Sequence, residues 1–288
     1  MRACAAPDVT NPGTEHSVLA FGCTECCESG PMPHTPNEPW KRYIHNSNTP
    51  STMSNVCSTV EELDERCVEF EKCGEGDSFL IERYLPKAKG DQVLAEIDSS
   101  ITYLSRDDPR MQFRIYGKEV KLPRDKAVLG EIEIDEEKKE RIEPFYRYAK
   151  DTPPVEDWKG TVLKEIQGYI TEDMDQSCNH VVVNQYRDGK DYIGYHHDKS
   201  KTFELGSSVL TLSLGASRIL RLRKVRGEGK GAIKNIKLNH GSLFVLGPET
   251  NRNWKHSIVQ KKGLEGRRVS LTYRSIAARR ISPFVKFV

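Results

Sequence analysis

Two histidines and an aspartate are the residues of this 288-residue chain best suited to hold a metal ion. His196 and Asp198 stand two positions apart, so in an extended segment both side chains emerge on the same face. His256 follows far downstream. Two imidazoles and one carboxylate on a β scaffold can occupy one face of an octahedral ferrous ion and leave its other positions open. A His-x-Asp pair is common by itself, and His197 is an alternative ligand that would project oppositely.

The segment 268–274 alternates polar and apolar residues and begins and ends with an arginine. As a strand it would place Arg268 and Arg274 on one face and its apolar residues on the other. Two arginines pointing into a barrel are costly unless anions meet them. A dicarboxylate that chelates the iron would supply those anions, because guanidinium groups match carboxylates in bidentate geometry. The alternative is a basic edge strand that faces solvent.

Short strands are expected to dominate the second half of the chain. The strand candidates there, separated by turns that contain Gly and Asn, are 180–186, 207–214, 218–222, 233–238, 242–246 and 269–273. Upstream of them, the apolar spacing predicts helices at 91–104 and 157–170. A strand that ends before Pro86 and a hairpin over 111–120 complete that region. The fold class is therefore predicted to be mainly β with flanking helices (α+β), with a sandwich or jelly roll as its core.

The N-terminal part differs in composition from the remainder. Residues 1–72 hold 5 basic and 11 acidic residues, residues 73–288 hold 39 basic and 31 acidic ones, and seven of the eight cysteines lie at or before Cys73. We expect residues 1–74 to be a disordered, Cys- and Pro-rich tail with one short helix at 58–73, and residues 75–288 to be the folded domain. A zinc site at Cys23, Cys26 and Cys27 is the alternative to a reduced cysteine cluster.

The composition also bounds the location of the protein. No stretch approaches the roughly 18 apolar residues of a membrane-spanning helix. The first thirty residues lack the basic start and apolar run of a secretory signal. We expect an intracellular monomer of the nucleus or cytoplasm, neither secreted nor membrane-bound. Because basic residues outnumber acidic ones in residues 73–288, we also expect a polyanionic partner.

Taken together, these residues resemble the AlkB family of iron(II)- and 2-oxoglutarate-dependent dioxygenases, over about residues 77–276. The resemblance implies a double-stranded β-helix (jelly roll) with an N-terminal nucleotide-recognition lid, and Fe(II), 2-oxoglutarate and O2 as cofactors. It makes His196, Asp198 and His256 the catalytic metal ligands. The residues that it implies for 2-oxoglutarate are Asn184, Tyr186, Arg268, Ser270 and Arg274. Ser270 stands where the family usually has Asn. Both side chains can form hydrogen bonds, but the serine side chain is shorter than that of asparagine and reaches less far.

The chain is most similar to the branch of the family that repairs duplex DNA. That similarity implies oxidative dealkylation of N-alkylated bases such as 1-methyladenine and 3-methylcytosine, with release of an aldehyde. Tyr116 would fill the gap left by the flipped base, and Tyr148 would stack on that base with Tyr146 nearby. Lys261 and Lys262 would grip the opposite strand. For each tyrosine, ordinary packing in the core is the alternative.

Two features leave the substrate open. Repair enzymes of this family commonly carry an acidic residue two positions after the metal aspartate, where this chain has Ser200. Either the preferred lesion differs, or Glu131 or Glu204 takes that role. A basic cluster at 218–237 surrounds a glycine-rich loop and favours contact with a nucleic-acid backbone. Three alternatives stand beside DNA repair: an RNA demethylase, a protein or small-molecule hydroxylase with the same iron centre, and a non-catalytic nucleic-acid binder.

Overall fold

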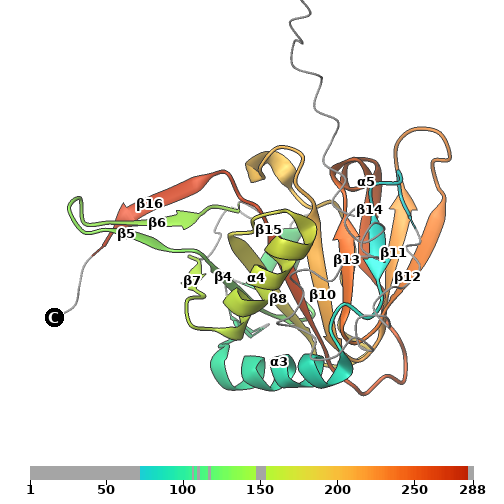
Figure 1. The fold of residues 1–288 in the computed structure, drawn as a ribbon. Helices are drawn as coiled ribbons and strands as arrows, with labels where there is room; N and C mark the ends of the chain where they lie inside the picture. Colours follow the sequence, from blue (N-terminus) through green and yellow to red (C-terminus); the bar gives the residue numbers. More distant parts are fainter. Residues whose placement is uncertain (1–71, 106, 109–110, 116–117, 147–153, 285–288) are drawn as a thin grey trace, which may run out of the picture. The chain divides into compact units, whose positions relative to one another are not determined.

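Two sheets of mainly antiparallel strands face each other in this protein and carry its functional residues between them (Figure 1). The computed structural model describes residues 72–284 except 106, 109–110, 116–117 and 147–153. By its internal contacts the chain separates into Met1–Asn37 and Glu38–Val288, and every element described below belongs to the second unit. The predicted tail, its cysteine cluster and most of the helix predicted at 58–73 therefore lie outside the described residues.

The larger sheet is the layer on which the site is built. Its strands are, in spatial order, β1 (Phe79–Ile81), β13 (Ser242–Leu246), β10 (Val209–Gly215), β15 (Arg268–Arg274), β8 (His180–Tyr186), β4 (Asp125–Gly130) and β7 (Glu156–Asp157). The facing sheet runs β12 (Ile233–Leu238), β11 (Arg218–Lys224), β14 (Trp254–Ile258) and β9 (Ile193–His196).

Smaller elements surround these two sheets. The remaining strands are β2 (Gln112–Ile115) paired with β3 (Lys118–Lys121), and the sheet of β16 (Arg279–Pro283), β6 (Glu140–Pro144) and β5 (Glu133–Asp135). The helices are α3 (Lys87–Ser100), α4 (Val162–Met174), the 3-10 turn η3 (Ser200–Thr202) and α5 (Pro248–Asn253). Among the described residues, no helix has the length and apolar character that crossing a bilayer requires.

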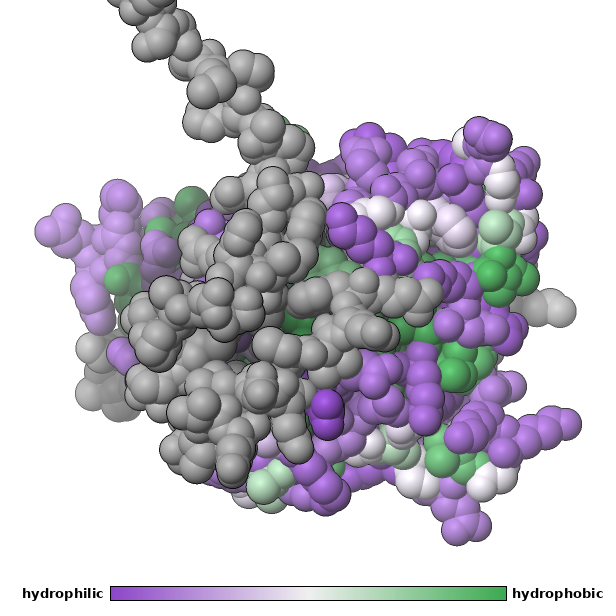
Figure 2. Space-filling view, turned by 45° about the vertical axis from the view of Figure 1, so that its right-hand side comes forward, coloured by the Kyte–Doolittle hydropathy of each residue, from purple (hydrophilic) through white to green (hydrophobic). Residues whose placement is uncertain are grey.

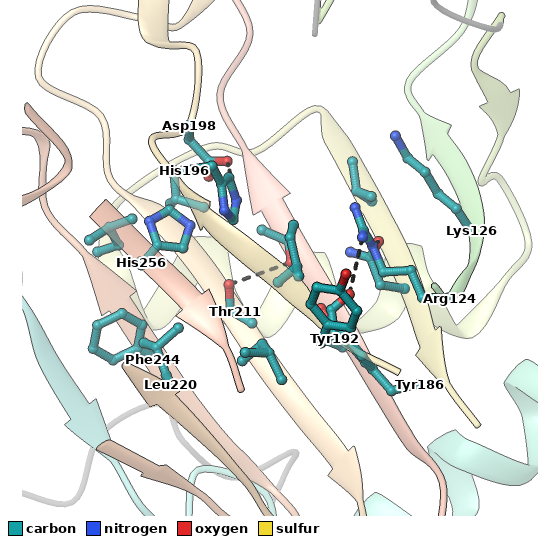
Figure 3. A pocket seen from close by; sticks show the side chains of 18 of the residues that line it. Arg124, Lys126, Tyr186, Tyr192, His196, Asp198, Thr211, Leu220, Phe244 and His256 are labelled. Carbon is teal, nitrogen blue, oxygen red and sulfur yellow. Dashed lines mark hydrogen bonds and ion pairs between the residues drawn. The ribbon is translucent and has the colours of Figure 1, made fainter. Parts of the chain in front are cut away.

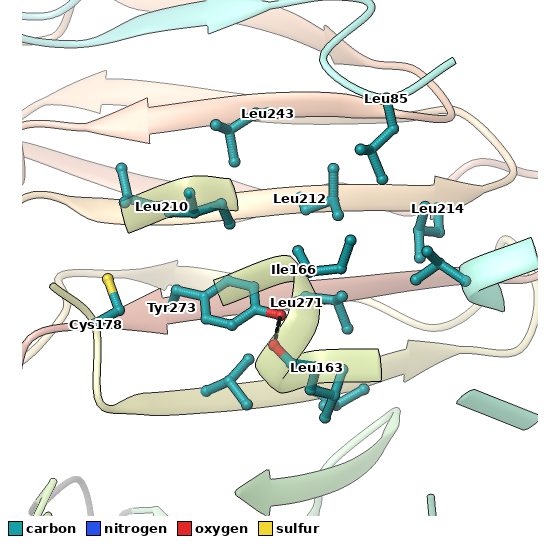
Figure 4. Packing of buried hydrophobic residues seen from close by; sticks show 14 of the residues in the cluster. Leu85, Leu163, Ile166, Cys178, Leu210, Leu212, Leu214, Leu243, Leu271 and Tyr273 are labelled. Atoms are coloured by element: carbon teal, nitrogen blue, oxygen red, sulfur yellow. Dashed lines mark hydrogen bonds between the residues drawn. The ribbon is translucent and has the colours of Figure 1, made fainter. Parts of the chain in front are cut away.

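Strand alternation divides the larger sheet into an apolar face and a face that lines a cavity. On β10, Leu210, Leu212 and Leu214 are buried against α3 and α4, and Figure 4 shows them packed with Ile166 of α4. The apolar residues of β15 lie in the same layer, where the hydroxyl of Tyr273 donates a 2.9 Å hydrogen bond to a backbone carbonyl of α4. Burying this face leaves the opposite face, with its polar residues, turned toward the second sheet.

The predicted fold class, mainly β with flanking helices around a jelly-roll core, is confirmed, and most predicted strands are present within two residues of their bounds. Both helices are shifted from their predicted ranges. α3 begins directly after Pro86 and ends at Ser100, because Ile101 is already extended (φ −103°, ψ 120°). α4 begins at Val162, because Asp157 pairs in the sheet as part of β7. The helix predicted to reach Cys73 is wrong at its end, since Cys73 forms an extended bridge with Ser78.

Candidate metal and co-substrate site

A cavity of about 490 Å³ opens between the two sheets, and Figure 3 shows the side chains that line it. The larger sheet contributes the polar face of β15, together with residues of β8 and β4. The smaller sheet contributes His196 at the end of β9 and His256 on β14. The site thus depends on strands that are far apart in sequence and meet only because the sheets are stacked.

The three predicted metal ligands meet at this cavity. One ligand atom from each of His196, Asp198 and His256 can be chosen so that all three lie within 4.8 Å of one another. β9 and β14 are paired with His196 directly opposite His256, and the two ring centroids are 4.1 Å apart. Two imidazoles and one carboxylate are a donor set suited to Fe(II). Sequence reasoning did not predict β9 or β14 as strands, and Asp198 lies just past the end of β9 rather than within an extended strand.

Neighbouring groups orient this cluster. The Nδ1 of His196 lies 2.9 Å from the backbone carbonyl of Gly194, so its proton is donated there and Nε2 is left to bind a metal. Asn251, on α5, accepts from the Asp198 N–H at 2.9 Å and donates to the Asp198 carbonyl at 3.0 Å. Sequence reasoning missed Asn251, because nothing in its local pattern links it to a residue so far upstream.

The pKa values of the three ligand side chains favour the protonation states that bind a cation. Burial lowers the pKa of His256 to about 3, and the neighbouring His196 adds to that effect. Burial by itself would raise the pKa of Asp198, but Arg274 and the two histidines outweigh it and hold that pKa well below its usual range. Arg274 donates to the Asp198 carboxylate at 3.0 Å. At neutral pH the site therefore offers two neutral imidazoles and one ionised carboxylate.

Arg268 and Arg274 both point into the cavity, as predicted. β15 lies between β10 and β8 and every residue in it is buried, so the alternative of an exposed edge strand is wrong. Arg268 is 1% exposed, and its Nη2 donates to Ser213 at 2.8 Å. Its Nε and Nη1, like the Nε of Arg274, find no hydrogen-bond partner among the described residues. Buried guanidinium donors left in this way fit the two carboxylates of 2-oxoglutarate.

The other residues predicted for 2-oxoglutarate line the same cavity. Asn184, Tyr186 and Ser270 face it, and Arg268 lies 5.2 Å above the centroid of the Tyr186 ring. Arg124 also faces the cavity and donates from Nε to the Asn184 side-chain oxygen at 2.9 Å. Sequence reasoning did not include Arg124, which directly precedes β4, among the residues of the site.

The structure describes three of the five residues that were predicted to contact the substrate. Tyr146 lines the cavity, packs against Phe203 with ring centroids 5.6 Å apart, and has its hydroxyl 3.5 Å from an Asp198 carboxylate oxygen. Tyr116 and Tyr148 lie outside the described residues. Lys261 and Lys262 are exposed in the loop between β14 and β15, where the Lys261 N–H donates to the Gly189 carbonyl at 2.9 Å.

The basic cluster of residues 218–237 separates into structural and exposed members. Arg218 is buried and donates to three backbone carbonyls, and Lys224 forms a 2.9 Å ion pair with Glu75. Four cations of the cluster remain exposed on β11, β12 and the loop that joins them: Arg223, Arg226, Lys230 and Lys237. Figure 2, which turns this side toward the viewer, shows a surface there that is largely hydrophilic.

Comparison with known proteins agrees with this geometry. The 2OG-Fe(II) oxygenase superfamily profile matches residues 78–274. The mouse protein named DNA oxidative demethylase ALKBH2 is 30% identical over 195 residues, which cover 66% of this chain and 76% of that protein. Its Arabidopsis thaliana namesake is 24% identical over 220 residues, covering 69% and 66%. Human alkB homolog 3, named an alpha-ketoglutarate-dependent dioxygenase, is 27% identical over 138 residues, covering 46% and 48%. The chain therefore belongs to the 2OG-Fe(II) oxygenase superfamily and, within it, to the AlkB family.

Proposed function

We propose that this protein removes alkyl groups from ring nitrogens of bases in DNA by oxidation, and so repairs the bases directly. As a member of its family it is a dioxygenase that uses Fe(II), 2-oxoglutarate and O2. The observation that carries the proposal is the position of the His-Asp-His cluster beside two buried arginines in one cavity. The relatives named DNA oxidative demethylases support DNA as the polymer.

The residues of the chain divide the work of such a reaction. His196, Asp198 and His256 would hold the iron, and Arg268 and Arg274 would neutralise and orient 2-oxoglutarate. When bound, iron and its co-substrates supply hydroxylation of the carbon attached to the base nitrogen, while 2-oxoglutarate becomes succinate and carbon dioxide. The hydroxylated group then leaves as an aldehyde and the base keeps its nitrogen.

Two features of the structure support a nucleic-acid substrate. Lys261 and Lys262 are exposed in the loop between β14 and β15, and exposed lysines can contact the phosphates of a nucleic acid. A base in a duplex must leave the stack to reach the iron, and Tyr146 provides an aromatic wall in the cavity. We further propose that the protein acts as a monomer inside the cell, in the nucleus or cytoplasm, without a membrane partner.

Mass spectrometry of methylated oligonucleotides tests the proposal. The full chain is incubated with ferrous iron, ascorbate and 2-oxoglutarate, and with 1-methyladenine, 3-methylcytosine, 1-methylguanine or 3-methylthymine in single-stranded DNA, duplex DNA and RNA. We expect methyl loss that requires 2-oxoglutarate and is greater in DNA than in RNA. Greater loss in RNA would replace DNA repair by RNA demethylation. Turnover of 2-oxoglutarate without methyl loss would point to another acceptor.

A further inference from the structure

The short helix α5 contacts the metal site at two points. Its Asn251 side chain forms two hydrogen bonds with the backbone of Asp198, at 2.9 and 3.0 Å, and Asn251 is itself only 5% exposed. The helix also leads directly into β14, the strand that carries His256 (Figure 1). The position of α5 therefore influences two of the three side chains that make up the His-Asp-His cluster.

α5 does not cap its own first turn. Its N-cap residue is Gly247, which has no side chain, and Pro248 follows it. The first N–H groups of a helix have no acceptor within the helix and need one from elsewhere. A helix of six residues also forms too few internal hydrogen bonds to be stable by itself. The geometry of α5 thus depends on acceptors that other parts of the chain supply.

Asp77, which stands 172 residues before Glu249, supplies these acceptors. Its carboxylate accepts from the Glu249 N–H at 2.8 Å and from the Thr250 N–H at 3.2 Å. The hydroxyl of the fully buried Thr250 donates to the same carboxylate. A Cβ at position 247 would lie 2.3 Å from the Asp77 carboxyl carbon and 2.4 Å from its backbone oxygen. The glycine at the N-cap therefore leaves the room that a cap from outside the helix requires.

The residues beside Asp77 hold both ends of α5. Just before the helix, the Gly247 N–H donates to the Ser78 hydroxyl oxygen at 2.9 Å. Just after it, the indole N–H of Trp254 donates to the Glu75 carboxylate at 2.8 Å. Residues 75–78 therefore contact α5 along its whole length, and Asp77 forms the contacts with its first turn.

These contacts form a continuous path from Asp77 to the metal site. Asp77 binds the backbone of Thr250, the next residue is Asn251, and Asn251 binds the backbone of Asp198. Because a side chain moves with the backbone that carries it, a displaced first turn of α5 would displace the Asn251 amide and, with it, the Asp198 backbone. Groups that orient metal ligands in this way typically change metal affinity by about 10–100-fold when they are removed.

We propose that Asp77 is a positioning residue of the metal site and sets the place of Asp198 through α5 and Asn251. The inference rests on the metal assignment within the proposed function, but it does not depend on which nucleic acid the protein acts on. It differs from a purely structural role of Asp77, because a residue that only stabilises the fold leaves the metal affinity of the folded protein unchanged.

Titration of Mn²⁺ into the full-length apoprotein, followed by calorimetry without nucleic acid, tests this inference. Urea unfolding of the same metal-free samples measures their stability separately. The variants are Asp77→Ala and Asp77→Asn. Asp135→Ala is the matched control, because the Asp135 carboxylate also accepts from two backbone N–H groups, at 3.1 and 2.9 Å, but does so in the turn between β5 and β6, outside the cavity lining.

We expect Asp77→Ala to weaken Mn²⁺ binding about tenfold, at the lower end of the range for a lost outer partner. Asp77→Asn keeps a side-chain oxygen that can accept the same N–H groups, so its affinity should stay within about threefold of wild type. Asp135→Ala should bind Mn²⁺ like the wild type even if it unfolds at lower urea. If Asp77→Ala does not fold, Thr250→Val removes one donor to Asp77 at little change in shape and should weaken binding about threefold.

Three results would overturn the inference. Wild-type Mn²⁺ affinity in Asp77→Ala, or in Thr250→Val where that variant replaces it, would make Asp77 a structural residue only. Equal weakening in Asp77→Ala and Asp77→Asn would assign the effect to the lost negative charge instead of the contacts with α5. A wild-type protein that binds no stoichiometric Mn²⁺ would reject the metal site itself. Failure of the oligonucleotide assay, in contrast, would reject the proposed function and leave the Mn²⁺ result standing, since the titration contains no nucleic acid.

Discussion

Replacing Arg268 by lysine tests the co-substrate site most directly. The guanidinium is 1% exposed and has two donors, Nε and Nη1, without partners among the described residues. A hydrogen bond between charged groups at a buried site contributes about 1.5–3 kcal/mol. Lysine keeps a positive charge but loses the planar pair of donors, so we expect a loss of about 2 kcal/mol. Because about 1.4 kcal/mol corresponds to tenfold in affinity, 2-oxoglutarate should bind roughly 30-fold more weakly.

Isothermal titration calorimetry of 2-oxoglutarate into protein loaded with Mn²⁺ measures this change without turnover. Arg267→Lys is the matched control, because the neighbouring Arg267 lies outside the cavity lining and donates to the carboxylate of Asp98 at the surface. It should change the affinity little, since exposed ion pairs contribute about 0–1 kcal/mol to stability and do not touch the cavity. An Arg268→Lys protein that folds normally and binds 2-oxoglutarate within about threefold of wild type would refute the assignment of Arg268.

Four further substitutions test the remaining parts of the site. His196→Ala should abolish turnover and leave the desalted protein without stoichiometric iron by elemental analysis; retained iron would contradict the metal site. Asn251→Ala removes both hydrogen bonds to the backbone of the metal-binding aspartate, so urea unfolding should show a loss of about 2 kcal/mol. Gly189→Ala would place its Cβ 1.9 Å from the Lys261 carbonyl oxygen, and displacing that loop should weaken duplex binding and flatten its salt dependence. Tyr116→Ala should lower activity on duplexes more than on single strands; equal effects would reject its assignment to base flipping.

Part of the site was predictable because a strand has a period of two. Alternation alone assigned Arg268 and Arg274 to one face of their strand and the apolar residues between them to the other, and the structure confirms both faces. The same pattern fits an edge strand in solvent. Only the pairing of β15 with β10 and β8 places it in the middle of the larger sheet, where its arginines are buried.

The local sequence pattern did not predict strands β9 and β14, because their extended conformation depends on tertiary contacts. β9 and β14 are short strands with polar residues, so neither has the apolar run that marks a strand in sequence. They are strands because their backbones pair with each other and because β14 also pairs with β11. That pairing sets His196 opposite His256, a relation that no spacing along the chain encodes.

The sequence by itself determined the types of ligand, the order of the motifs and the faces that polar side chains share, since these depend on residue identity and on strand periodicity. Tertiary structure alone decided which residues surround the reacting space. It placed Lys126 and Arg124 in the cavity, bound Asn251 to the Asp198 backbone, and left Glu131 and Glu204 outside the cavity lining. The physical reason is that burial and charge at a point depend on every strand that packs there, and those strands come from distant parts of the chain.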